Sequence, residues 1–355
     1  MCGPIAVSGG VSTHTKNIIK QLLNLGVEIH FFNQWDDNES SFYSSFRKLY
    51  LRSFGLFIEA IRMRREYDII HIQASGGLAS FISAISGAII SIILDKKLVV
   101  TFHYSRTAEF VDKYKFLIKF VVAHANKFIL VSPKQKNIFL INYNAFSEKF
   151  ETLFNGYDSD LYIKRDKHEC RNILKISEDK RIIFNISNLI DTKGHKYLIL
   201  ALKRILIVRK DIICFIAGKG YLKEELERLI TNLGLQDYIQ LIGWISDEKV
   251  PLWMSASDIF VLPSLAEGNP TVMFEALGSG LPFIGTNVGG IPEIINSLDY
   301  GIICEPANPK DLAEKIQYAL GKNWDKELIS NYSKNFTWKK IALANLHIYK
   351  EIMKD

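Results

Sequence analysis

Residues 258–294, which read DIFVLPSLAEGNPTVMFEALGSGLPFIGTNVGGIPEI, form the most informative stretch of the sequence. The apolar run at 259–262 predicts a strand that ends at Pro263. Pro270 follows a short polar loop and suits the first turn of a helix, because the N–H that proline lacks would have no partner there. We expect this helix to end near the glycines at 278–280. A strand, a loop and a helix in this order are typical of one βα unit in a parallel sheet.

Two glutamates flank the start of the predicted helix. Glu267 lies in the loop, and Glu275 lies about a turn and a half inside the helix. Between them are unpaired backbone N–H groups and the positive end of the helix dipole, which together favour a bound phosphate. Acceptors on both sides of an anion site suit a sugar nucleotide, which has hydroxyls at both ends and a diphosphate between them. The alternative is an ordinary βα unit whose glutamates lie on a solvated helix face.

The same stretch resembles a known signature. The two glutamates have the spacing E-x7-E within EGNPTVMFEAL, and GLPFIGTNVGGIPEI follows. This combination resembles the donor site of retaining GT-B glycosyltransferases, specifically glycosyltransferase family 4. The resemblance implies two Rossmann-like, doubly wound α/β domains that face each other across a cleft, with a C-terminal helix that crosses back to the N-terminal domain. The implied bounds are 1–158, 159–335 and, for the helix, 336–355.

The bulk composition fits this two-domain expectation. The chain has 355 residues, of which 48% are hydrophobic and 23% charged, so it is long for one core and too apolar to be disordered. The four cysteines lie far apart and form no C-x-x-C pair, which argues against a zinc site or a disulfide framework and favours a reducing cytoplasm. We expect no secretory signal, because MCGPIAVSGG has neither a basic start nor a long apolar core.

The positive charge lies in the first half of the chain. Residues 1–165 contain 20 Lys and Arg against 14 Asp and Glu, whereas residues 166–355 contain 24 of each. A basic half can face an anionic lipid surface, a phosphate-bearing acceptor or nucleic acid. Nucleic acid is disfavoured, because no recognition module accompanies the charge. We expect a cytoplasmic location. One interpretation of the charge is a phosphate-bearing acceptor or peripheral contact with anionic lipid at the inner face of the plasma membrane, and the alternative of equal weight is solvated helix faces without a partner.

Short apolar runs alternate with helical patterns in both halves, as in parallel α/β sheets. In the first half, the candidate strands are 28–33, 68–73, 98–103 and 127–131. Residues 1–7 leave room only for a short first strand, unless the native start lies further upstream. In the second half, the candidate strands are 181–187, 212–217, 239–241, 259–262 and 282–285. An amphipathic helix is predicted after Asn335.

Two segments allow more than one interpretation. Residues 78–94 form a nearly uncharged run of 17, short of the roughly 20 that a bilayer span needs. Because the run lies between candidate strands, a buried crossover helix is favoured over a helix that dips into a membrane. Residues 150–164 are predicted to connect the domains. Within them, Asp158-Ser159-Asp160 matches the metal-binding D-x-D of the other major glycosyltransferase fold, but it follows a turn, so we assign it to linker and helix-cap chemistry.

The first half contains two candidate site elements. Gly9 and Gly10 precede a helical pattern, and paired glycines let a backbone approach a ligand closely. Ser12 or Thr13 is expected to cap the helix. By resemblance, the glycines correspond to a loop that contacts donor phosphate and acceptor, and His103 to a histidine that contacts the donor sugar. The alternatives are a tight βα turn and a satisfied core histidine.

The second half of the chain contains two further candidate site elements. Residues 187–194, SNLIDTKG, match the family element G-R-L-x-x-x-K-G, with serine and asparagine in place of the first glycine and the arginine. The resemblance implies that Lys193 neutralises the donor diphosphate. Asn188 offers a hydrogen bond but lacks the charged, bidentate contact of arginine. Gly218 and Lys219 resemble a family turn of the form G-x-G, in which the lysine approaches base or phosphate.

The resemblance as a whole implies a retaining, metal-independent hexosyltransferase that moves a sugar from a UDP- or GDP-sugar to a glycan or lipid-linked acceptor, as in bacterial-type surface polysaccharide or glycolipid assembly. The alternatives are a non-catalytic GT-B subunit that stabilises a partner transferase and a GT-B nucleotide-sugar epimerase. The implied catalytic residues are Glu267, His103 and Lys193. The implied donor-binding residues are Gly9, Gly10, Asn188, Lys193, Gly218, Lys219, Gly268, Asn269, Pro270, Thr271 and Glu275.

Overall fold

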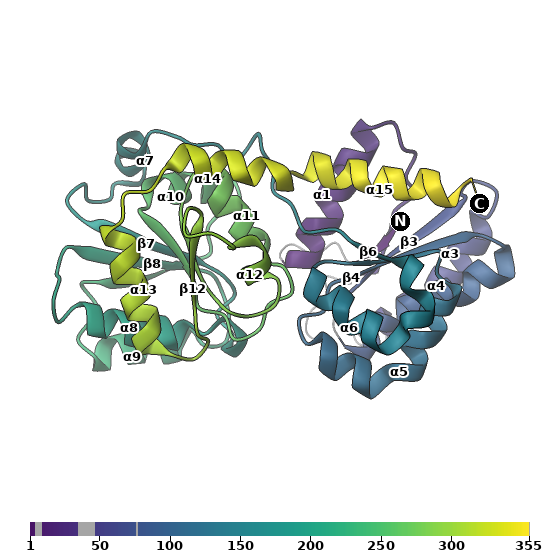
Figure 1. The fold of residues 1–355 in the computed structure, drawn as a ribbon, viewed down its shortest axis with the longest axis horizontal. Coiled ribbons are helices and arrows are strands. Elements are labelled where there is room, and N and C mark those ends of the chain that lie inside the picture. The colour runs from purple at the N-terminus through teal and green to yellow at the C-terminus, as the bar shows by residue number, and fades with distance from the viewer. Residues whose placement is uncertain (4–8, 35–46, 76, 355) are drawn as a thin grey trace. The chain divides into compact units, whose positions relative to one another are not determined.

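The chain forms two compact units. Unit 1 comprises Met1–Gly156 together with Trp338–Asp355, and unit 2 comprises Tyr157–Thr337. The structure, a computed structural model, describes residues 1–3, 9–34, 47–75 and 77–354. Among these residues, each unit contains one six-stranded parallel sheet with helices on both faces (Figure 1). The predicted two-domain α/β architecture is confirmed.

The sheet of unit 1 has the strand order β2-β1-β3-β4-β5-β6. Its strands are β1 (Cys2–Gly3), β2 (Phe32–Asn33), β3 (Ile69–Ala74), β4 (Lys97–Phe102), β5 (Lys127–Leu130) and β6 (Phe150–Thr152). Successive residues of the inner strands enter opposite cores: Val99 and Ile129 are buried on one face, and Val100 and Phe128 on the other. Burial on both faces produces the continuous apolar runs from which these strands are predicted.

One face of this sheet is covered by α1 (Gly10–Asn24) and α15 (Trp338–Ile352), which lie side by side (Figure 1). Ile18 and Leu22 of α1 share a buried cluster with Trp338 and Ile341 of α15. The predicted return of the C-terminal helix to the N-terminal domain is therefore confirmed. The other face is covered by α3 (Leu56–Arg62), α4 (Leu78–Leu94), α5 (Thr107–His124) and α6 (Pro133–Tyr143).

Helix α4 coincides with the run predicted as a crossover helix, and it connects β3 to β4. Phe81, Ala84 and Ala88 are fully buried in the core beneath it. Two of its buried serines bond to their own helix: Ser83 Oγ donates to the carbonyl of Ser80 at 2.7 Å and Ser91 Oγ to that of Ala88 at 2.8 Å. Among the described residues, the structure contains no helix with both the length and the apolar character needed to cross a membrane.

The structure differs from three predictions in unit 1. The strand predicted at 28–33 forms only as β2, because its partner β1 is two residues long. Residues 150–164 are more than a connection, because β6 pairs with β5 as the edge strand of the sheet. Helix α1 begins at Gly10 with Gly9 as its N-cap, so Ser12 and Thr13 lie inside the helix and neither caps it. The short first strand is confirmed as β1; residues 4–7 of that prediction lie outside the described residues.

The sheet of unit 2 has the strand order β12-β11-β10-β7-β8-β9. Its strands are β7 (Arg181–Ile186), β8 (Ile212–Ala217), β9 (Ile239–Gly243), β10 (Ile259–Leu262), β11 (Phe283–Thr286) and β12 (Gly301–Cys304). All but β12 match predicted strands to within two residues. Its helices are α7 (Lys167–Leu174), α8 (His195–Ile205), α9 (Lys223–Asn232), α10 (Val250–Ala256), α11 (Thr271–Gly278), α12 (Ile291–Ile294), α13 (Pro309–Gly321) and α14 (Lys326–Ser333).

Two local predictions in unit 2 need correction or refinement. Pro270 is the N-cap of α11 and not its first residue, because its ψ of 124° is extended. Asp158 forms a local turn, in which its Oδ1 accepts a hydrogen bond from the N–H of Asp160 at 3.1 Å. The linker part of the D-x-D assignment agrees with this turn next to the unit boundary, but the helix-cap part is wrong. The cap of the next helix, α7, is Asp166, whose side chain accepts from the N–H of Glu169.

Candidate functional site

The candidate site of unit 2 lies at the carboxyl edge of its sheet. The loops after β7, β8, β10 and β11 all begin at this edge, because the strands are parallel. Ligands of open α/β sheets bind outside the carboxyl ends of the strands. The predicted residues Asn188, Lys193, Gly218 and Glu267 lie in three of these loops.

Lys193 and Glu267 form an ion pair between two of the loops. Lys193 Nζ lies 2.6 Å from Glu267 Oε1, and Ser264 Oγ donates to the same oxygen at 2.6 Å. The side chains are 22% and 8% exposed, respectively. Partial burial reduces screening by solvent and strengthens such a pair relative to a surface one. The site therefore presents a fixed cation and a fixed carboxylate. The carboxylate belongs to the loop that leads directly into α11, and the cation to the loop after β7.

Close backbone contacts hold the two loops together. The N–H of Leu265 donates to the carbonyl of Thr192 at 2.7 Å. Gly194 has a φ of +66°, and a Cβ at this position would lie 2.1 Å from the carbonyl oxygen of Pro263. Only glycine combines this backbone angle with such a close approach. The glycine of the K-G element thus permits the contact that brings Lys193 next to Glu267.

The two glycines after β11 support the Glu267 loop as well. Gly289 has a φ of +56°, and a Cβ there would lie 2.0 Å from the carbonyl oxygen of Glu267. The N–H of Gly290 donates to the carbonyl of Gly268 at 2.7 Å. The GG-x-P-E segment of the sequence therefore fixes the backbone on which the Glu267 side chain is mounted.

Glu275 occupies a different environment, half-buried inside α11. Burial raises the pKa of Glu275 to about 7; a hydrogen bond from the buried Tyr162 hydroxyl opposes this shift, and the charge of Asp247 adds to it. Its carboxyl group therefore changes charge close to neutral pH. Above this pKa both carboxylate oxygens accept from ribose hydroxyls, whereas below it one oxygen carries a proton and the group is a weaker acceptor.

Gly218 and its neighbours serve packing. Gly218 has a φ of +146°, and a Cβ there would lie 1.9 Å from the carbonyl oxygen of Ser187. A Cβ at Gly220 would lie 2.1 Å from the carbonyl oxygen of Leu189. These contacts hold the loop after β8 against the loop that carries Asn188. The G-x-G pattern is thus explained by loop packing alone, whatever Gly218 contacts in a complex.

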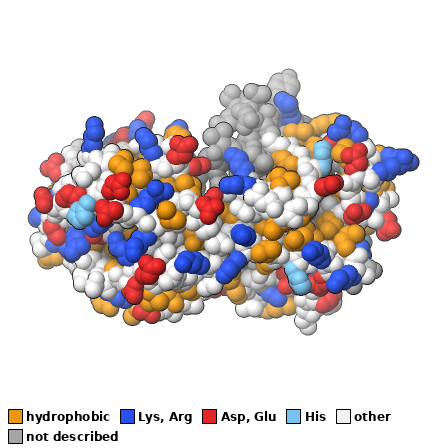
Figure 2. All heavy atoms as spheres, turned by 90° about the horizontal axis from the view of Figure 1, so that it is seen from above, with side chains coloured by type: hydrophobic (Ala, Val, Ile, Leu, Met, Phe, Trp, Pro, Cys, Tyr) orange, Lys and Arg blue, Asp and Glu red, His pale blue; other side chains and the backbone are white. Residues whose placement is uncertain are grey.

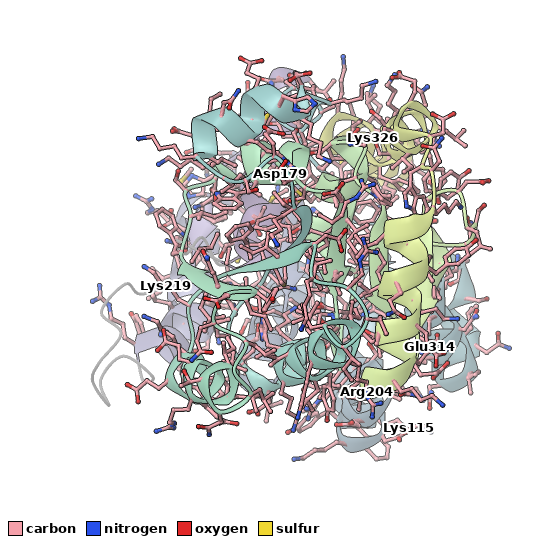
Figure 3. All side chains as sticks on the ribbon, turned by 90° about the vertical axis from the view of Figure 1, so that its left-hand side faces the viewer. Lys115, Asp179, Arg204, Lys219, Glu314 and Lys326 are labelled. Carbon is pink, nitrogen blue, oxygen red and sulfur yellow. The ribbon has the colours of Figure 1, made fainter. Side chains whose placement is uncertain are left out.

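The side chains beside these glycines are open to solvent. Lys219 is exposed at the rim of unit 2 (Figure 3), and its ammonium lies 5.3 Å from the ring centroid of Trp244. Trp244 is 53% exposed and directly follows β9. Asn188 is also exposed. The structure therefore leaves Asn188 and Lys219 accessible but does not bring either into the Lys193–Glu267 contact.

In unit 1, the predicted residue His103 belongs to a histidine cluster. It directly follows β4, and its ring centroid lies 4.5 Å from that of His14 in α1. His103 Nε2 lies 2.8 Å from Gln73 Oε1. Burial lowers the pKa of His14 to about 4 and that of His71 to about 3, and it holds the pKa of His103 well below its ordinary value. All three rings are therefore neutral at pH 7.

The glycine pair at the start of α1 is exposed. Gly9 has a φ of +131°, which favours glycine, and a Cβ at Gly9 or Gly10 would meet no atom of the described residues within 4 Å. Space beside a helix N-terminus is what a phosphate contact requires. Gly9 and Gly10 thus meet the geometric condition for the role that the resemblance implies.

Several polar residues of these sites were not predicted. Ser264 and Tyr162 act through hydrogen bonds to Glu267 and Glu275, and Gln73 acts through one to His103. For Ser264, the sequence contains a signal, because it lies within the P-S-x-x-E part of the donor signature. Tyr162 and Gln73 have no such signal, since their partners are distant in sequence.

Comparison with known proteins identifies the family. A family model described as Glycosyltransferase Family 4 matches residues 8–161, and one described as Glycosyl transferases group 1 matches residues 166–336. The chain belongs to the family 4 glycosyltransferases. These matches confirm the family that is expected from the donor signature of this family 4 glycosyltransferase.

Curated relatives are similar at low identity. N-acetyl-alpha-D-glucosaminyl L-malate synthase of Bacillus anthracis is 28% identical over 214 residues, which cover 59% of this chain and 55% of that protein. The uncharacterized glycosyltransferase MJ1607 of Methanocaldococcus jannaschii is 28% identical over 63% of this chain and 60% of its own length. The phosphatidylinositol N-acetylglucosaminyltransferase GPI3 subunit of Saccharomyces cerevisiae is 24% identical over 97% of this chain and 80% of that protein.

Solved structures share the fold. Sucrose-phosphate synthase from Thermosynechococcus elongatus has a TM-score of 0.82 at 18% identity and covers 99% of both chains. Anabaena Alr3699/HepE in complex with UDP-glucose has a TM-score of 0.75 at 20% identity, and the match covers 100% of this chain and 99% of that one. At these identities the likeness shows the architecture, a two-domain GT-B fold.

Proposed function

We propose that this protein is a retaining glycosyltransferase that moves a hexose from a UDP- or GDP-sugar to a glycan or lipid-linked acceptor in surface polysaccharide or glycolipid assembly. The Lys193–Glu267 pair carries the proposal, because it holds a cation and a carboxylate at the ligand-binding edge of the unit 2 sheet. The UDP-glucose complex of Alr3699/HepE supports a nucleotide sugar as donor. The names of the malate synthase and of the phosphatidylinositol transferase subunit support a small or lipid acceptor.

In this proposal, each site residue has one task. Lys193 and the backbone N–H groups of residues 268–271 stabilise negative charge on the departing diphosphate. Glu267 accepts hydrogen bonds from donor-sugar hydroxyls, Glu275 accepts from the ribose, and His103 orients the sugar. The bond from the anomeric carbon to the phosphate oxygen breaks, and a bond to the acceptor oxygen forms on the same face. The departing phosphate takes the acceptor proton, so the step needs neither a covalent protein nucleophile nor a metal.

We also propose that unit 1 contacts an anionic membrane. Phe54 and Ile58 are 69% and 56% exposed, and Ile92 and Ile93 of the adjoining helix α4 are 52% and 58% exposed. Nearby exposed cations are Arg62, Arg64 and Arg65. Figure 2 shows hydrophobic side chains among Lys, Arg, Asp and Glu side chains over the visible face of unit 1. Apolar residues bordered by cations suit the interface of an anionic bilayer. This contact would place the enzyme at the cytoplasmic face of the plasma membrane.

A donor screen tests the proposed activity. Nucleotide release from UDP- and GDP-sugars is measured with and without EDTA, and saturation-transfer NMR measures binding in parallel. We expect release from one donor class that survives EDTA. A strict need for added manganese would contradict metal independence. Failure of every nucleotide to bind would favour a non-catalytic subunit, and epimerisation of the donor without an acceptor would favour an epimerase.

Vesicle sedimentation tests the membrane contact. The protein should sediment with phosphatidylglycerol vesicles more than with phosphatidylcholine vesicles, because the cations add to apolar insertion. The double variant Phe54→Ser/Ile58→Ser should lose this binding. Equal binding of the wild type and the double variant, with no difference between the two lipids, would contradict the assignment of this surface.

A further inference from the structure

A chain of hydrogen bonds connects the C-terminal helix to His103. Tyr349 Oη of α15 bonds to His71 Nδ1. Gln73 Nε2 lies 3.1 Å from His71 Nε2, and Gln73 Oε1 lies 2.8 Å from His103 Nε2. His71 and Gln73 are two residues apart on β3 and therefore point to the same face of the sheet. Gln73 is 1% exposed and His71 3% exposed, so solvent cannot replace these bonds.

The chemistry of the groups gives the chain a direction. An amide NH2 only donates, so Gln73 Nε2 must donate to His71 Nε2, and the neutral His71 ring then carries its proton on Nδ1. The hydroxyl of Thr101, 2.8 Å away, donates to the same His71 nitrogen. At its other end, Gln73 offers a carbonyl oxygen that only accepts. His103 must therefore donate from Nε2, which leaves its Nδ1 as an acceptor.

We propose that Gln73 is a positioning residue that fixes His103 in the tautomer with its proton on Nε2, so that Nδ1 accepts a hydrogen bond from a donor-sugar hydroxyl. The proposal rests on the proposed glycosyltransferase function and goes beyond it by stating which nitrogen contacts the sugar. A tautomer set by a second residue is a common way to orient a histidine. Through their hydrogen bonds, Tyr349 of α15 and His71 fix the orientation of Gln73 in turn.

The surroundings of His103 leave this role to Gln73. Within the described part of the chain, the titratable groups that act on the His103 ring are His14 of α1 and His71 of β3, and both have lowered pKa values. Neither carries a charge at pH 7 that would select a tautomer. Burial and the neighbouring rings keep His103 neutral, and the Gln73 oxygen decides which nitrogen is protonated.

Nitrogen NMR tests the tautomer directly. Long-range 1H–15N spectra of histidine-labelled protein distinguish an Nε2–H ring from an Nδ1–H ring without any substrate. We expect Nε2–H for His103 in the wild type and a mixture of tautomers in Gln73→Leu. The control Asn345→Leu removes a buried amide of the same unit whose side chain bonds within α15, and it should leave the His103 signal unchanged. An unaltered Nε2–H signal in Gln73→Leu would overturn the proposal.

Steady-state kinetics test whether the tautomer of His103 affects sugar transfer. Gln73→Leu should lower kcat about tenfold, and Asn345→Leu should not. Gln73→Glu keeps the acceptor but adds a charge, which raises the pKa of His103; its activity should fall as the pH drops through neutrality and recover at higher pH. A changed tautomer with unchanged kcat and KM would overturn the role in sugar contact. If the wild type turned over no donor, the proposed function would fail, while the NMR result would still decide the role of Gln73.

Discussion

Lys193 Nζ lies 2.6 Å from Glu267 Oε1, although the two residues follow different strands, β7 and β10. The contact depends on two glycines at which any Cβ would collide with the Glu267 loop, Gly194 and Gly289. The loops are thus locked before any ligand arrives. A site fixed in this way stabilises developing charge without having to reorganise during the reaction.

Loss of the lysine tests whether the pair acts in transfer. Lys193→Met should lower kcat about 100-fold, because one donor to the departing diphosphate is removed. Lys196→Met, which removes an exposed lysine three residues further on, should leave kcat within about twofold of wild type. Steady-state kinetics with the best donor measure both, and urea unfolding checks that both variants fold. Equal activity of the two variants would exclude Lys193 from catalysis.

The raised pKa of Glu275 predicts a pH dependence of donor binding. Because burial raises its pKa to about 7, Glu275 is mostly protonated at pH 6 and mostly ionised at pH 8. The KM for the donor should therefore fall about tenfold between these values, since the ionised carboxylate is the better acceptor. A nucleotide sugar has no phosphate that titrates in this range. A constant KM from pH 6 to 8 would contradict the assignment.

Tyr162 supplies the matched variant for this pH profile. Its hydroxyl lowers the pKa of Glu275, in opposition to burial. Tyr162→Phe removes that hydroxyl and keeps the ring, so the pKa should rise and the midpoint of the KM profile should move to higher pH. A profile that moves to lower pH would show that the Tyr162 hydroxyl disfavours the carboxylate.

The missing arginine predicts a gain of affinity. Asn188 is exposed in the loop after β7, where the family pattern has arginine. Asn188→Arg should tighten binding of a nucleoside diphosphate about tenfold, which corresponds to one charge-assisted hydrogen bond. Asn188→Gln provides a longer side chain without charge and should bind like the wild type. Calorimetry that shows no gain for the arginine variant would mean that another group already fills this role.

A buried charge cluster predicts how unit 2 responds to acid. Asp258 Oδ2 lies 2.9 Å from the guanidinium of Arg171, which is 2% exposed, and Oδ1 lies 2.7 Å from Lys167 Nζ. Burial pushes the pKa of Asp258 up, but the hydrogen bonds and charges of its partners outweigh burial and lower it. This stabilisation is therefore present above the unfolded-state pKa and is lost as the pH falls through the lowered folded-state pKa.

Urea unfolding measures how much the Asp258 cluster contributes to the free energy of unfolding. Asp258→Asn should lower the free energy of unfolding by about 3 kcal/mol at pH 7, because the buried Arg171 loses its nearest carboxylate and keeps mainly backbone carbonyl acceptors. The difference from wild type should shrink below pH 4. The control Asp211→Asn breaks an exposed pair with Arg209 and should change the free energy by less than about 1 kcal/mol. Equal losses of free energy in Asp258→Asn and Asp211→Asn at pH 7 would show that the Asp258 cluster contributes no more to stability than an exposed ion pair does.

The sequence predicts the inner strands well and the edges poorly. Strands β8 and β10 are buried on both faces and consist of unbroken apolar runs, and β3 and β4 are mostly apolar. Strand β6 has three residues, so its pattern is too short to separate from a loop, and β12 is the other edge strand that the sequence does not predict. Pairing with a neighbour, which local sequence does not encode, makes them strands.

The same distinction applies to the site. Glu267 and Lys193 are predictable because they lie in segments with a recognisable order of residues. Tyr162 and Gln73 are not, because each becomes functional only when the fold brings it to a partner on another element. The pKa of Glu275 likewise depends on burial, which is a property of the folded chain.

Unit 2 should bind a nucleoside diphosphate sugar through Glu275 and the neighbouring loops. Calorimetry with UDP and GDP tests it on the wild type, on Glu275→Ala and on Glu314→Ala, which removes an exposed glutamate of α13 (Figure 3). We expect that one nucleotide binds the wild type, that Glu275→Ala binds it at least about tenfold more weakly, and that Glu314→Ala binds it as well as the wild type does. Equal affinity of all three proteins, or no binding of either nucleotide, would contradict it.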